Sequence, residues 1–249
     1  MDYNRALEEA HPGAVLLHQG ETYLVKELDL EKDVALVVKE ELDYYTDALK
    51  VSEVSLLQRR RNQEADGLEL GLGELRVREQ VIGYRIKRYE QTLGLKELQL
   101  PAVEFETTGL WLAFPESLQH EVERAGWGWQ GGLHGAEHAL IAMAPFYAMC
   151  DRWDIGGVST PLHPDLGGPG IFIYDGFPGG IGITEKLYEL LPEWLEAIYR
   201  LVKDCPCEEG CPSCIYSPKC GNQNRPLDKE AALLILRAIR EALAARAAA

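Results

Sequence analysis

Five of the six cysteines lie within residues 205–220, and thiols at this density can bind a metal ion. Pro and Gly turn the backbone between them, and an all-sulfur cage is typical of Zn²⁺, which takes four tetrahedral ligands. Two of the cysteines flank Pro212-Ser213 in a C-x-x-C spacing, which lets two sulfurs face one ion. The sequence therefore predicts a Zn²⁺ site built from four of these five residues: Cys205, Cys207, Cys211, Cys214 and Cys220.

The spacing leaves the fourth ligand open between Cys205 and Cys220. A disulfide cluster is the alternative, but we expect no secretory signal segment at the start of the chain, and cysteines as close as Cys205 and Cys207 strain a disulfide. Four sulfurs leave no coordination position for water or substrate. We therefore expect a structural ion rather than a catalytic one.

Length and charge limit the classes of function. The chain has 249 residues with 46% hydrophobic content, enough for one large or two small globular domains. Its 25 Lys and Arg against 40 Asp and Glu argue against a protein that coats nucleic acid by charge alone. No apolar run is long enough for a membrane span, and free cysteines suit a reducing compartment. We expect a cytoplasmic protein with no membrane partner.

The pattern of hydrophobic residues predicts an α+β fold. A β-rich antiparallel N-terminal half, residues 1–114, is expected to pack on a mainly helical, zinc-stabilised C-terminal half, residues 115–249. Loops are expected at residues 156–157 and 161–170, and Asp228 is expected to cap a terminal helix. Expected strands cover residues 14–18, 22–25, 34–38, 51–57, 68–72, 81–86 and 171–174, and expected helices cover 118–125 and 134–149 and begin near 184 and 228.

His134-Gly-Ala-Glu-His138 fits the H-x-x-E-H pattern of inverted zinc peptidases. In that pattern two histidines one helical turn apart bind metal, and Glu137 activates water. The alternative is a pair of structural histidines on one helix, because a five-residue motif is short and a third ligand is not evident. A stand-alone metallohydrolase remains a competing hypothesis for the whole chain.

Glycines 176, 179, 180 and 182 precede a predicted helix that begins near Thr184. Free backbone N–H groups at a helix start can hold an anion, such as a phosphate of nucleic acid. The simpler interpretation is a tight strand-to-helix turn, because glycine tolerates positive φ.

Residues 59–88 form a basic segment within the acidic chain, with eight Lys and Arg residues and five Asp and Glu residues. A local basic region of this kind can contact nucleic acid, and Tyr84 and Tyr89 could stack on bases. A solvated strand face is the equal alternative. The candidate contacts are Arg59, Arg60, Arg61, Arg85, Lys87 and Arg88.

Several motifs together resemble the C-terminal region of DEAD/DEAH-box DNA helicases of the MrfA/YprA type, which ends in an MrfA zinc-binding domain. The resemblance rests on residues 11–21, 44–46, 134–138, 174–182, 205–222 and 227–229.

The resemblance implies an accessory domain of an ATP-dependent, 3′-to-5′, superfamily-two DNA helicase that acts in DNA repair. The implied partners are the motor domains of the same parent protein and single-stranded or forked DNA, and the implied cofactor is Zn²⁺ held by four cysteines. More distant relatives keep a C-x-C-x3-C-x2-C part, which favours Cys205 over Cys220 as the fourth ligand.

The chain carries no ATPase motor of its own. The sequence has no G-x-x-x-x-G-K-[ST] loop to bind phosphates, and Glu8-Glu9-Ala10-His11 only resembles a DEAH box, because Glu replaces the Asp that holds metal. We therefore expect a domain that supports a motor or guides DNA. The remaining alternative is a protein-interaction module that docks through the apolar stripe of its terminal helix.

Overall fold

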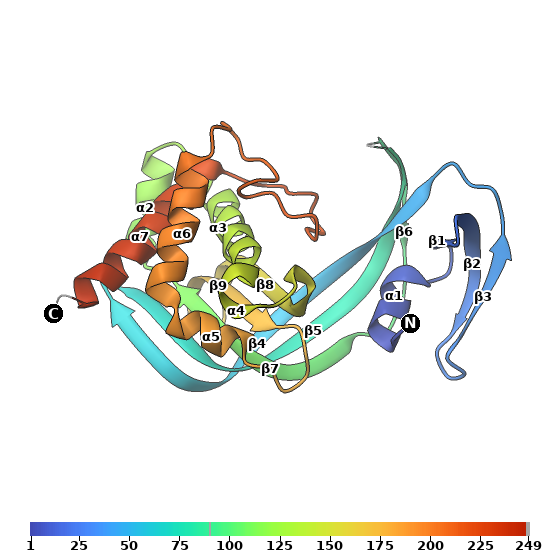
Figure 1. Ribbon diagram of the computed structural model, residues 1–249, viewed down its shortest axis with the longest axis horizontal. Helices are drawn as coiled ribbons and strands as arrows, with labels where there is room; N and C mark the ends of the chain where they lie inside the picture. Colours follow the sequence, from blue (N-terminus) through green and yellow to red (C-terminus); the bar gives the residue numbers. More distant parts are fainter. Residues whose placement is uncertain (90, 248–249) are drawn as a thin grey trace. The chain divides into compact units, whose positions relative to one another are not determined.

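The computed structural model describes residues 1–89 and 91–247, which fall into two compact units (Figure 1). Unit 1 comprises Met1–Ser52 with Arg78–Glu104, and unit 2 comprises Glu53–Val77 with Phe105–Ala249. Antiparallel sheets and helices concentrated in the C-terminal half confirm the α+β class. The sequence predicts a boundary after residue 114 between a β-rich half and a helical half. That boundary stays a prediction, because the two units are defined by contacts and not by strand or helix content.

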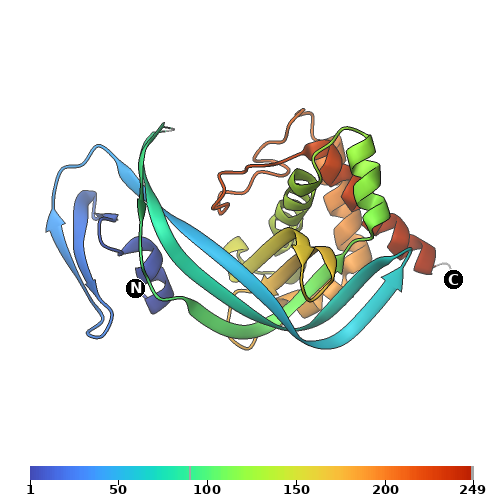
Figure 2. The same ribbon diagram turned by 180° about the vertical axis from the view of Figure 1, so that it is seen from behind.

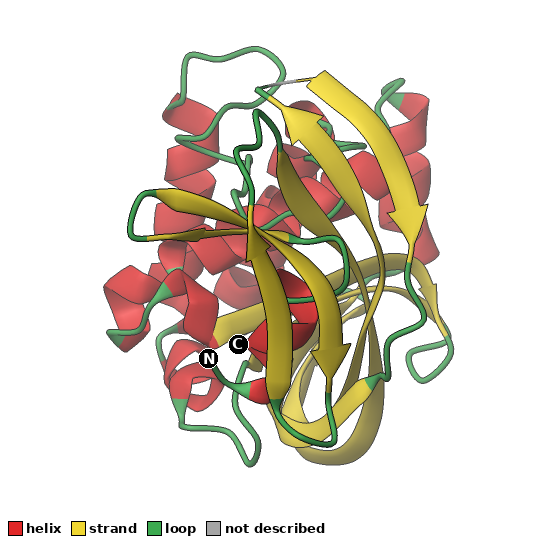
Figure 3. Cartoon of the chain, turned by 90° about the vertical axis from the view of Figure 1, so that its right-hand side faces the viewer, coloured by secondary structure: helices red, strands yellow, loops and turns green. Residues whose placement is uncertain are grey.

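Unit 1 begins with helix α1 (Tyr3–Glu9), followed by an antiparallel sheet of order β1-β2-β3 (Figure 3, strands in yellow). The Asp2 side chain accepts a hydrogen bond from the Arg5 N–H at 2.9 Å and so caps the helix. Gln19 and Gly20 both have positive φ, which is the geometry of a two-residue hairpin turn. The strands expected at residues 14–18 and 22–25 are confirmed and pair antiparallel as a hairpin. The strands are β1 (Val15–His18), β2 (Glu21–Asp29) and β3 (Val34–Lys39).

His11 is buried in unit 1, with its ring centroid 4.5 Å from that of Tyr84. Gly13 has a φ of +85°, and a Cβ there would overlap the Tyr84 hydroxyl. The break after α1 is therefore fixed by the packing of Tyr84 as well as by Pro12.

A second sheet has the order β4-β5-β7-β9-β8, with β6 (Gln91–Glu97) paired to β5. Two of its strands are much longer than the short runs expected, and they contribute residues to both units. Asp66 and Gly67 join these strands in a turn with positive φ at both positions. The strands are β4 (Tyr45–Ala65), β5 (Leu68–Arg88), β7 (Val103–Ala113), β8 (Ile155–His163) and β9 (Gly168–Asp175).

Strands β8 and β9 correct most of the loops predicted at residues 156–157 and 161–170, since residues 164–167 alone of these form a turn. Gly156 pairs with Tyr174 of β9, and a Cβ on Gly156 would overlap the Tyr174 ring. A Cβ on Gly157 would lie 2.9 Å from Glu137 Oε1. These glycines permit close packing within a strand and do not mark a turn.

Helices of unit 2 cover β8 and β9 (Figures 1 and 2). Leu133, Ala136 and Leu140 of α3 share a core with Ile173 of β9 and Ile235 of α7. Helix α3 starts five residues before the expected position and ends at Met143, where Pro145 begins a short separate helix. The helices are α2 (Glu116–Arg124), α3 (Trp129–Met143), α4 (Pro145–Ala148), the 3₁₀ turn η1 (Arg152–Asp154), α5 (Ile183–Glu189), α6 (Leu191–Asp204) and α7 (Lys229–Ala247).

Helices α3 and α7 approach closely because glycine lines their contact. A Cβ on Gly132 would lie 2.5 Å from the Ala231 Cβ. Asp228 joins the starts of both helices, since its carboxylate accepts from Gly128 N at 2.6 Å and from Ala231 N at 3.0 Å. The expected cap at Asp228 is confirmed, and it holds the scaffold on which the cysteine loop rests.

Within the described residues, no helix combines the length and apolarity needed to cross a bilayer.

Candidate metal centre

Four cysteine sulfurs meet in the loop that follows α6. The Sγ atoms of Cys205, Cys207, Cys211 and Cys214 all lie within 4.8 Å of one another. Cys205 Sγ is 3.6 Å from Cys207 Sγ and 3.5 Å from Cys211 Sγ, and Cys214 Sγ is 3.5 Å from Cys207 Sγ and 3.8 Å from Cys211 Sγ. A tetrahedron with Zn–S bonds of about 2.3 Å has edges of about 3.8 Å. The four sulfurs therefore fit one Zn²⁺ ion.

The cluster is positioned by the end of α6 and the start of α7. Helix α6 buries Trp194, Ile198 and Val202 on one face, and Cys205 follows its last residue. The buried Lys229, in the first turn of α7, donates from Nζ to the Cys205 carbonyl at 2.7 Å and to the Cys207 carbonyl at 2.5 Å. Lys229 thus fixes the backbone of two thiols and brings a positive charge close to them.

The cysteine environment shows why the cluster suits a cation. The hydrogen bond from the Ser213 backbone lowers the pKa of Cys211 to about 7, whereas burial raises the pKa of Cys214 to about 12. The Cys211 N–H also points at Cys214 Sγ at 3.3 Å, an arrangement that supports a thiolate. Several thiolates this close repel one another unless a divalent cation lies between them.

Cys220 lies apart from this cluster. Its Sγ groups with His134 and His138, and all three ligand atoms lie within 4.8 Å of one another. Burial disfavours the thiolate, but hydrogen bonds from His138 and from the Asn224 N–H outweigh it, and the pKa of Cys220 is lowered. The sequence identified all three residues but did not place them together.

Glu137 does not join the two histidines of its motif in this group. It is buried, and its Oε2 accepts a hydrogen bond from the Ser159 hydroxyl of β8 at 2.5 Å. Burial raises the pKa of Glu137, and the bond from Ser159 opposes that shift. The arrangement gives Glu137 a packing role against β8 and leaves it without the geometry of a water-activating base.

The glycine-rich start of α5 holds an internal anion. Asp175 is fully buried, and its Oδ2 accepts from the N–H groups of Ile181, Gly182 and Ile183 at 2.7, 2.9 and 3.2 Å. Its Oδ1 accepts from Thr184 N at 2.9 Å. The backbone donors that could have bound a phosphate are therefore already paired with a carboxylate of the same chain.

The six candidate nucleic-acid contacts divide between the units. Arg59, Arg60 and Arg61 belong to unit 2, and Arg85, Lys87 and Arg88 belong to unit 1. Four of them face carboxylates in the pairs Arg59–Glu69, Arg60–Glu74, Arg85–Asp47 and Arg88–Asp43. The guanidinium of Arg61 lies over the Tyr188 ring at 5.8 Å, and Lys87 Nζ lies over the Tyr45 ring at 5.7 Å.

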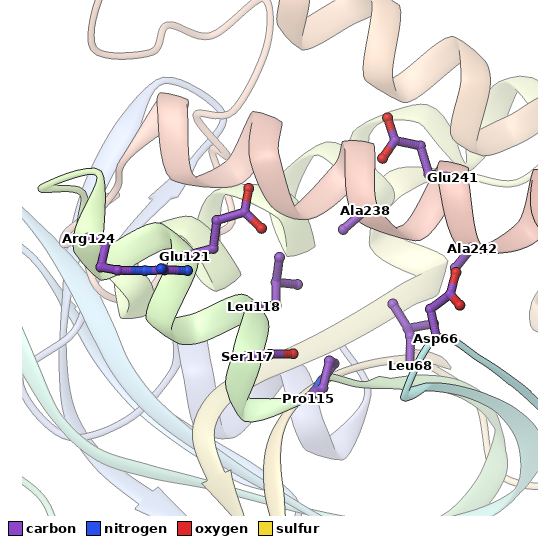
Figure 4. Close-up of a pocket in the computed structure, with 10 residues that line it drawn as sticks. All are labelled: Asp66, Leu68, Pro115, Ser117, Leu118, Glu121, Arg124, Ala238, Glu241 and Ala242. Carbon is purple, nitrogen blue, oxygen red and sulfur yellow. The ribbon is translucent and has the colours of Figure 1, made fainter.

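A shallow cavity of about 340 Å³ lies in unit 2 between α2, α7 and the β4–β5 turn (Figure 4). Leu118 and Ala238 form part of its floor, and Glu121, Arg124 and Glu241 lie around it. None of the cysteines discussed above lines it. The apolar stripe of α7 that could have docked a partner is itself buried, with Ile235, Leu236 and Ile239 fully covered.

Comparison with known proteins identifies the domain. A model of the MrfA Zn-binding domain matches residues 136–215. A protein of Methanocaldococcus jannaschii is 42% identical over 109 residues, which are 96% of its length. The chain belongs to the MrfA Zn-binding domain family. Zn²⁺ is accordingly the ion that the four-cysteine cluster suits.

Helicases are among the relatives of this chain. The ATP-dependent helicase YprA of Bacillus subtilis is 33% identical over 217 residues, 86% of this chain and 29% of YprA. The ATP-dependent helicase HRQ1 of Saccharomyces cerevisiae is 25% identical over 252 residues, 92% of this chain and 22% of HRQ1. The chain thus spans less than a third of the length of these helicases.

A solved structure extends the likeness across almost the whole chain. The crystal structure of the helicase MrfA bound to DNA matches 96% of this chain and 31% of that chain, with a TM-score of 0.65 and 29% identity. The family-model match ends at Ile215 and so includes α6 and the four-cysteine cluster but not Cys220.

Sequence reasoning missed the role of Lys229. Its position directly after Asp228, the helix cap, was the available signal, because a Lys at the start of a helix opposes the dipole and needs another reason to be there. The two carbonyls of the cysteine loop supply that reason.

Proposed function

We propose that this chain is the C-terminal accessory region of an ATP-dependent superfamily-two DNA helicase that acts in DNA repair. The observation that carries the proposal is the match of 96% of the chain to the helicase MrfA bound to DNA. The chain has no phosphate-binding loop of its own, so ATP hydrolysis and 3′-to-5′ movement would come from motor domains of the parent protein. The region itself would support the motor and guide a DNA strand.

The Zn²⁺ ion has a structural role in this proposal, with Cys205, Cys207, Cys211 and Cys214 as ligands. Bound Zn²⁺ supplies a rigid tetrahedral link and neutralises the thiolates. Cys205 extends the end of α6, and Lys229 ties the same loop to the start of α7. A clamp between two helices would keep the surface of unit 2 in one shape while the motor works.

The DNA contacts are proposed at the six basic residues in two groups, one in each unit. In the Arg60–Glu74 and Arg88–Asp43 pairs both side chains are exposed, so phosphates could exchange with these carboxylates at small cost, because surface ion pairs contribute only about 0–1 kcal/mol. The exposed ring of Tyr45 beside Lys87 offers a stacking surface for unpaired bases, whereas the Tyr188 ring beside Arg61 is buried. Single-stranded or forked DNA is the ligand that these groups favour.

Fluorescence anisotropy of the intact chain with single-stranded, forked and duplex DNA tests the proposal. We expect binding that weakens steeply with salt, because each phosphate contact releases counterions. Changing Arg59, Arg60 and Arg61 together to Gln should lower the affinity and the salt slope, and so should changing Arg85, Lys87 and Arg88. Lys32→Gln and Lys186→Gln, which remove exposed lysines elsewhere in the two units, provide the control.

A DNA affinity that does not depend on salt concentration, or that is unchanged in both triple variants, would contradict the DNA-guiding role. The link to a motor has its own check. The reading frame around this chain should encode a Walker-type motor, or such a motor should bind the chain and lose unwinding activity when the chain is removed.

A further inference from the structure

A second group of metal-binding side chains lies outside the four-cysteine cluster. His134 and His138 are one turn apart on α3, with ring centroids 4.2 Å apart. Cys220 reaches them from the loop before α7, and its Sγ is 3.4 Å from His134 Nε2. Around a tetrahedral Zn²⁺ with Zn–N of about 2.05 Å and Zn–S of about 2.3 Å, the N···S distance is about 3.6 Å. The three atoms therefore have the spacing of ligands to one ion.

Hydrogen bonds at the far side of each ring orient the histidines. His134 Nδ1 is 2.9 Å from the Pro226 carbonyl, and His138 Nδ1 is 2.8 Å from the Ile215 carbonyl. A carbonyl oxygen can only accept, so each Nδ1 carries the hydrogen. In a neutral imidazole Nε2 then has a free lone pair. Metal-binding histidines are held in this way by a partner at the other nitrogen.

The cysteine is also prepared by its surroundings. The Asn224 N–H lies 3.2 Å from Cys220 Sγ and can stabilise a thiolate. The same Asn224 side chain accepts from Ser217 N at 2.7 Å and donates to the Ser217 carbonyl at 3.1 Å. The loop that presents Cys220 is thus closed by its own hydrogen bonds. Helix α3 supplies the other two ligands from a buried, regular segment.

We propose that His134, His138 and Cys220 bind a second Zn²⁺ ion, separate from the ion of the four-cysteine cluster. Among biological cations, Zn²⁺ is one that typically binds imidazole nitrogen and thiolate sulfur. Three protein ligands leave the fourth tetrahedral position to a water molecule. The second ion would tie α3 to the loop before α7, whereas the first ties α6 to the loop after it. The inference does not depend on the proposed helicase role.

The stoichiometry of the unaltered chain is the first test. The chain is purified without a metal-affinity tag, titrated with Zn²⁺, passed over a desalting column and measured for zinc and protein. We expect two zinc ions per chain, with the second removed first by a chelator because it has fewer ligands. X-ray absorption at the zinc edge should then show about 2.5 sulfur and about 1.5 nitrogen or oxygen neighbours per zinc.

One zinc per folded chain, with a shell of four sulfurs, would overturn the proposal. In that case Cys220 and the two histidines would form a hydrogen-bonded thiol–imidazole group without metal.

Variants assign the second ion to its ligands. Cys220→Ser and His138→Gln should each lower the content from two zinc ions to one and leave the four-sulfur shell of the remaining ion. Cys150→Ser is the matched control, because Cys150 is a partly buried free cysteine that belongs to neither group, and it should keep both ions. Loss of the first ion in Cys220→Ser, or retention of both ions in that variant, would contradict the assignment.

Discussion

At the residue scale, Lys229 is the clearest example of a side chain that acts through other residues. Its ammonium group is buried and bonds the carbonyls of two cysteines. Groups that orient metal ligands in this way typically change metal affinity by about 10- to 100-fold when they are removed. Lys219 offers a comparison, because its Nζ also bonds two backbone carbonyls, Arg152 O at 2.8 Å and Ile155 O at 2.6 Å.

Lys229→Met should therefore weaken Zn²⁺ binding at the four-cysteine cluster by about 10- to 100-fold. Competition with a coloured zinc chelator measures the affinity. Lys219→Met should reduce stability through its own two lost hydrogen bonds but leave the affinity of this cluster unchanged. Equal affinities in wild type and Lys229→Met would show that the loop holds its shape without the lysine.

His11 should make the stability of unit 1 depend on pH. Burial lowers the pKa of His11 from its usual 6.5, against a raising effect of its bond to the Pro12 carbonyl. The unfolded chain therefore binds a proton more readily than the folded one. The stability that neutral His11 contributes is present above about pH 6.5 and is lost as the pH falls through the lowered folded-state pKa.

We expect the amides of β2 to lose protection from hydrogen exchange between about pH 7.5 and about pH 5, relative to His11→Gln at each pH. The comparison at equal pH removes the intrinsic pH dependence of exchange. His18→Gln, at an exposed histidine of the same unit, should retain the wild-type behaviour. An identical profile in wild type and His11→Gln would remove His11 as the cause.

The sequence was informative about residues whose partners lie nearby in the chain. Cysteine spacing alone named a zinc site, because four ligands within ten residues can close only around each other. Cys220 could not be placed in the same way, since its partners His134 and His138 are more than 80 residues away. This contact depends on how α3 packs against the loop before α7, and the local spacing of residues does not predict that packing.

At the element scale, Asp175 replaces an external anion at the start of α5. Four backbone N–H groups converge on its buried carboxylate. The glycines were recognised in the sequence, but the identity of their partner was not, because Asp175 looked like the end of a strand. The strand and the helix are joined by this carboxylate as well as by the turn between them.

Asp175→Asn should lower the free energy of unfolding by about 2–4 kcal/mol, because four backbone N–H groups donate to the two oxygens of the buried carboxylate and an amide has only one acceptor oxygen. Urea unfolding followed by circular dichroism, which reports on both units, measures the change. Asp29→Asn is the control, since the half-buried Asp29 carboxylate also accepts from two backbone N–H groups but remains in contact with solvent. A loss in Asp175→Asn no greater than the loss in Asp29→Asn would contradict this account.

Helices and strands with a clear hydrophobic periodicity are easier to predict from sequence than elements rich in small residues. The cap at Asp228 and the stripe of α7 follow from residue types alone. Strand β8 was missed because Gly156 and Gly157 look like a turn, whereas they make room for Tyr174 and Glu137. The early start of α3 was missed for the same reason, since Gly131 and Gly132 permit contact with α7. Tertiary packing decides the role of such glycines.

At the scale of the whole molecule, the two units should respond differently to loss of zinc. The four-cysteine cluster lies wholly in unit 2, between α6 and α7. A structural zinc site can supply about 10–16 kcal/mol of apparent binding free energy that is coupled to folding. Unit 1 has its own three-stranded sheet and the buried contact between His11 and Tyr84.

Cys211→Ser combined with Cys214→Ser should release the first zinc ion and lower the melting temperature of unit 2. Hydrogen exchange should accelerate at residues 205–228, the last turn of α6 and the first turn of α7. The β1-β2-β3 sheet should keep its protection. Cys150→Ser again serves as the control, and an unchanged melting curve in the double variant would exclude a structural role for the ion.

Strand β4 lies at one edge of its sheet, and part of that edge carries Arg59, Arg60 and Arg61. An open strand edge can pair with another chain, and rows of charge are one of the means by which proteins prevent this. The same arginines proposed to contact DNA would therefore also keep separate molecules apart. Neutralising all three arginines should promote self-association at high protein concentration. Light scattering of the variant without DNA would detect this effect separately from any change in DNA affinity.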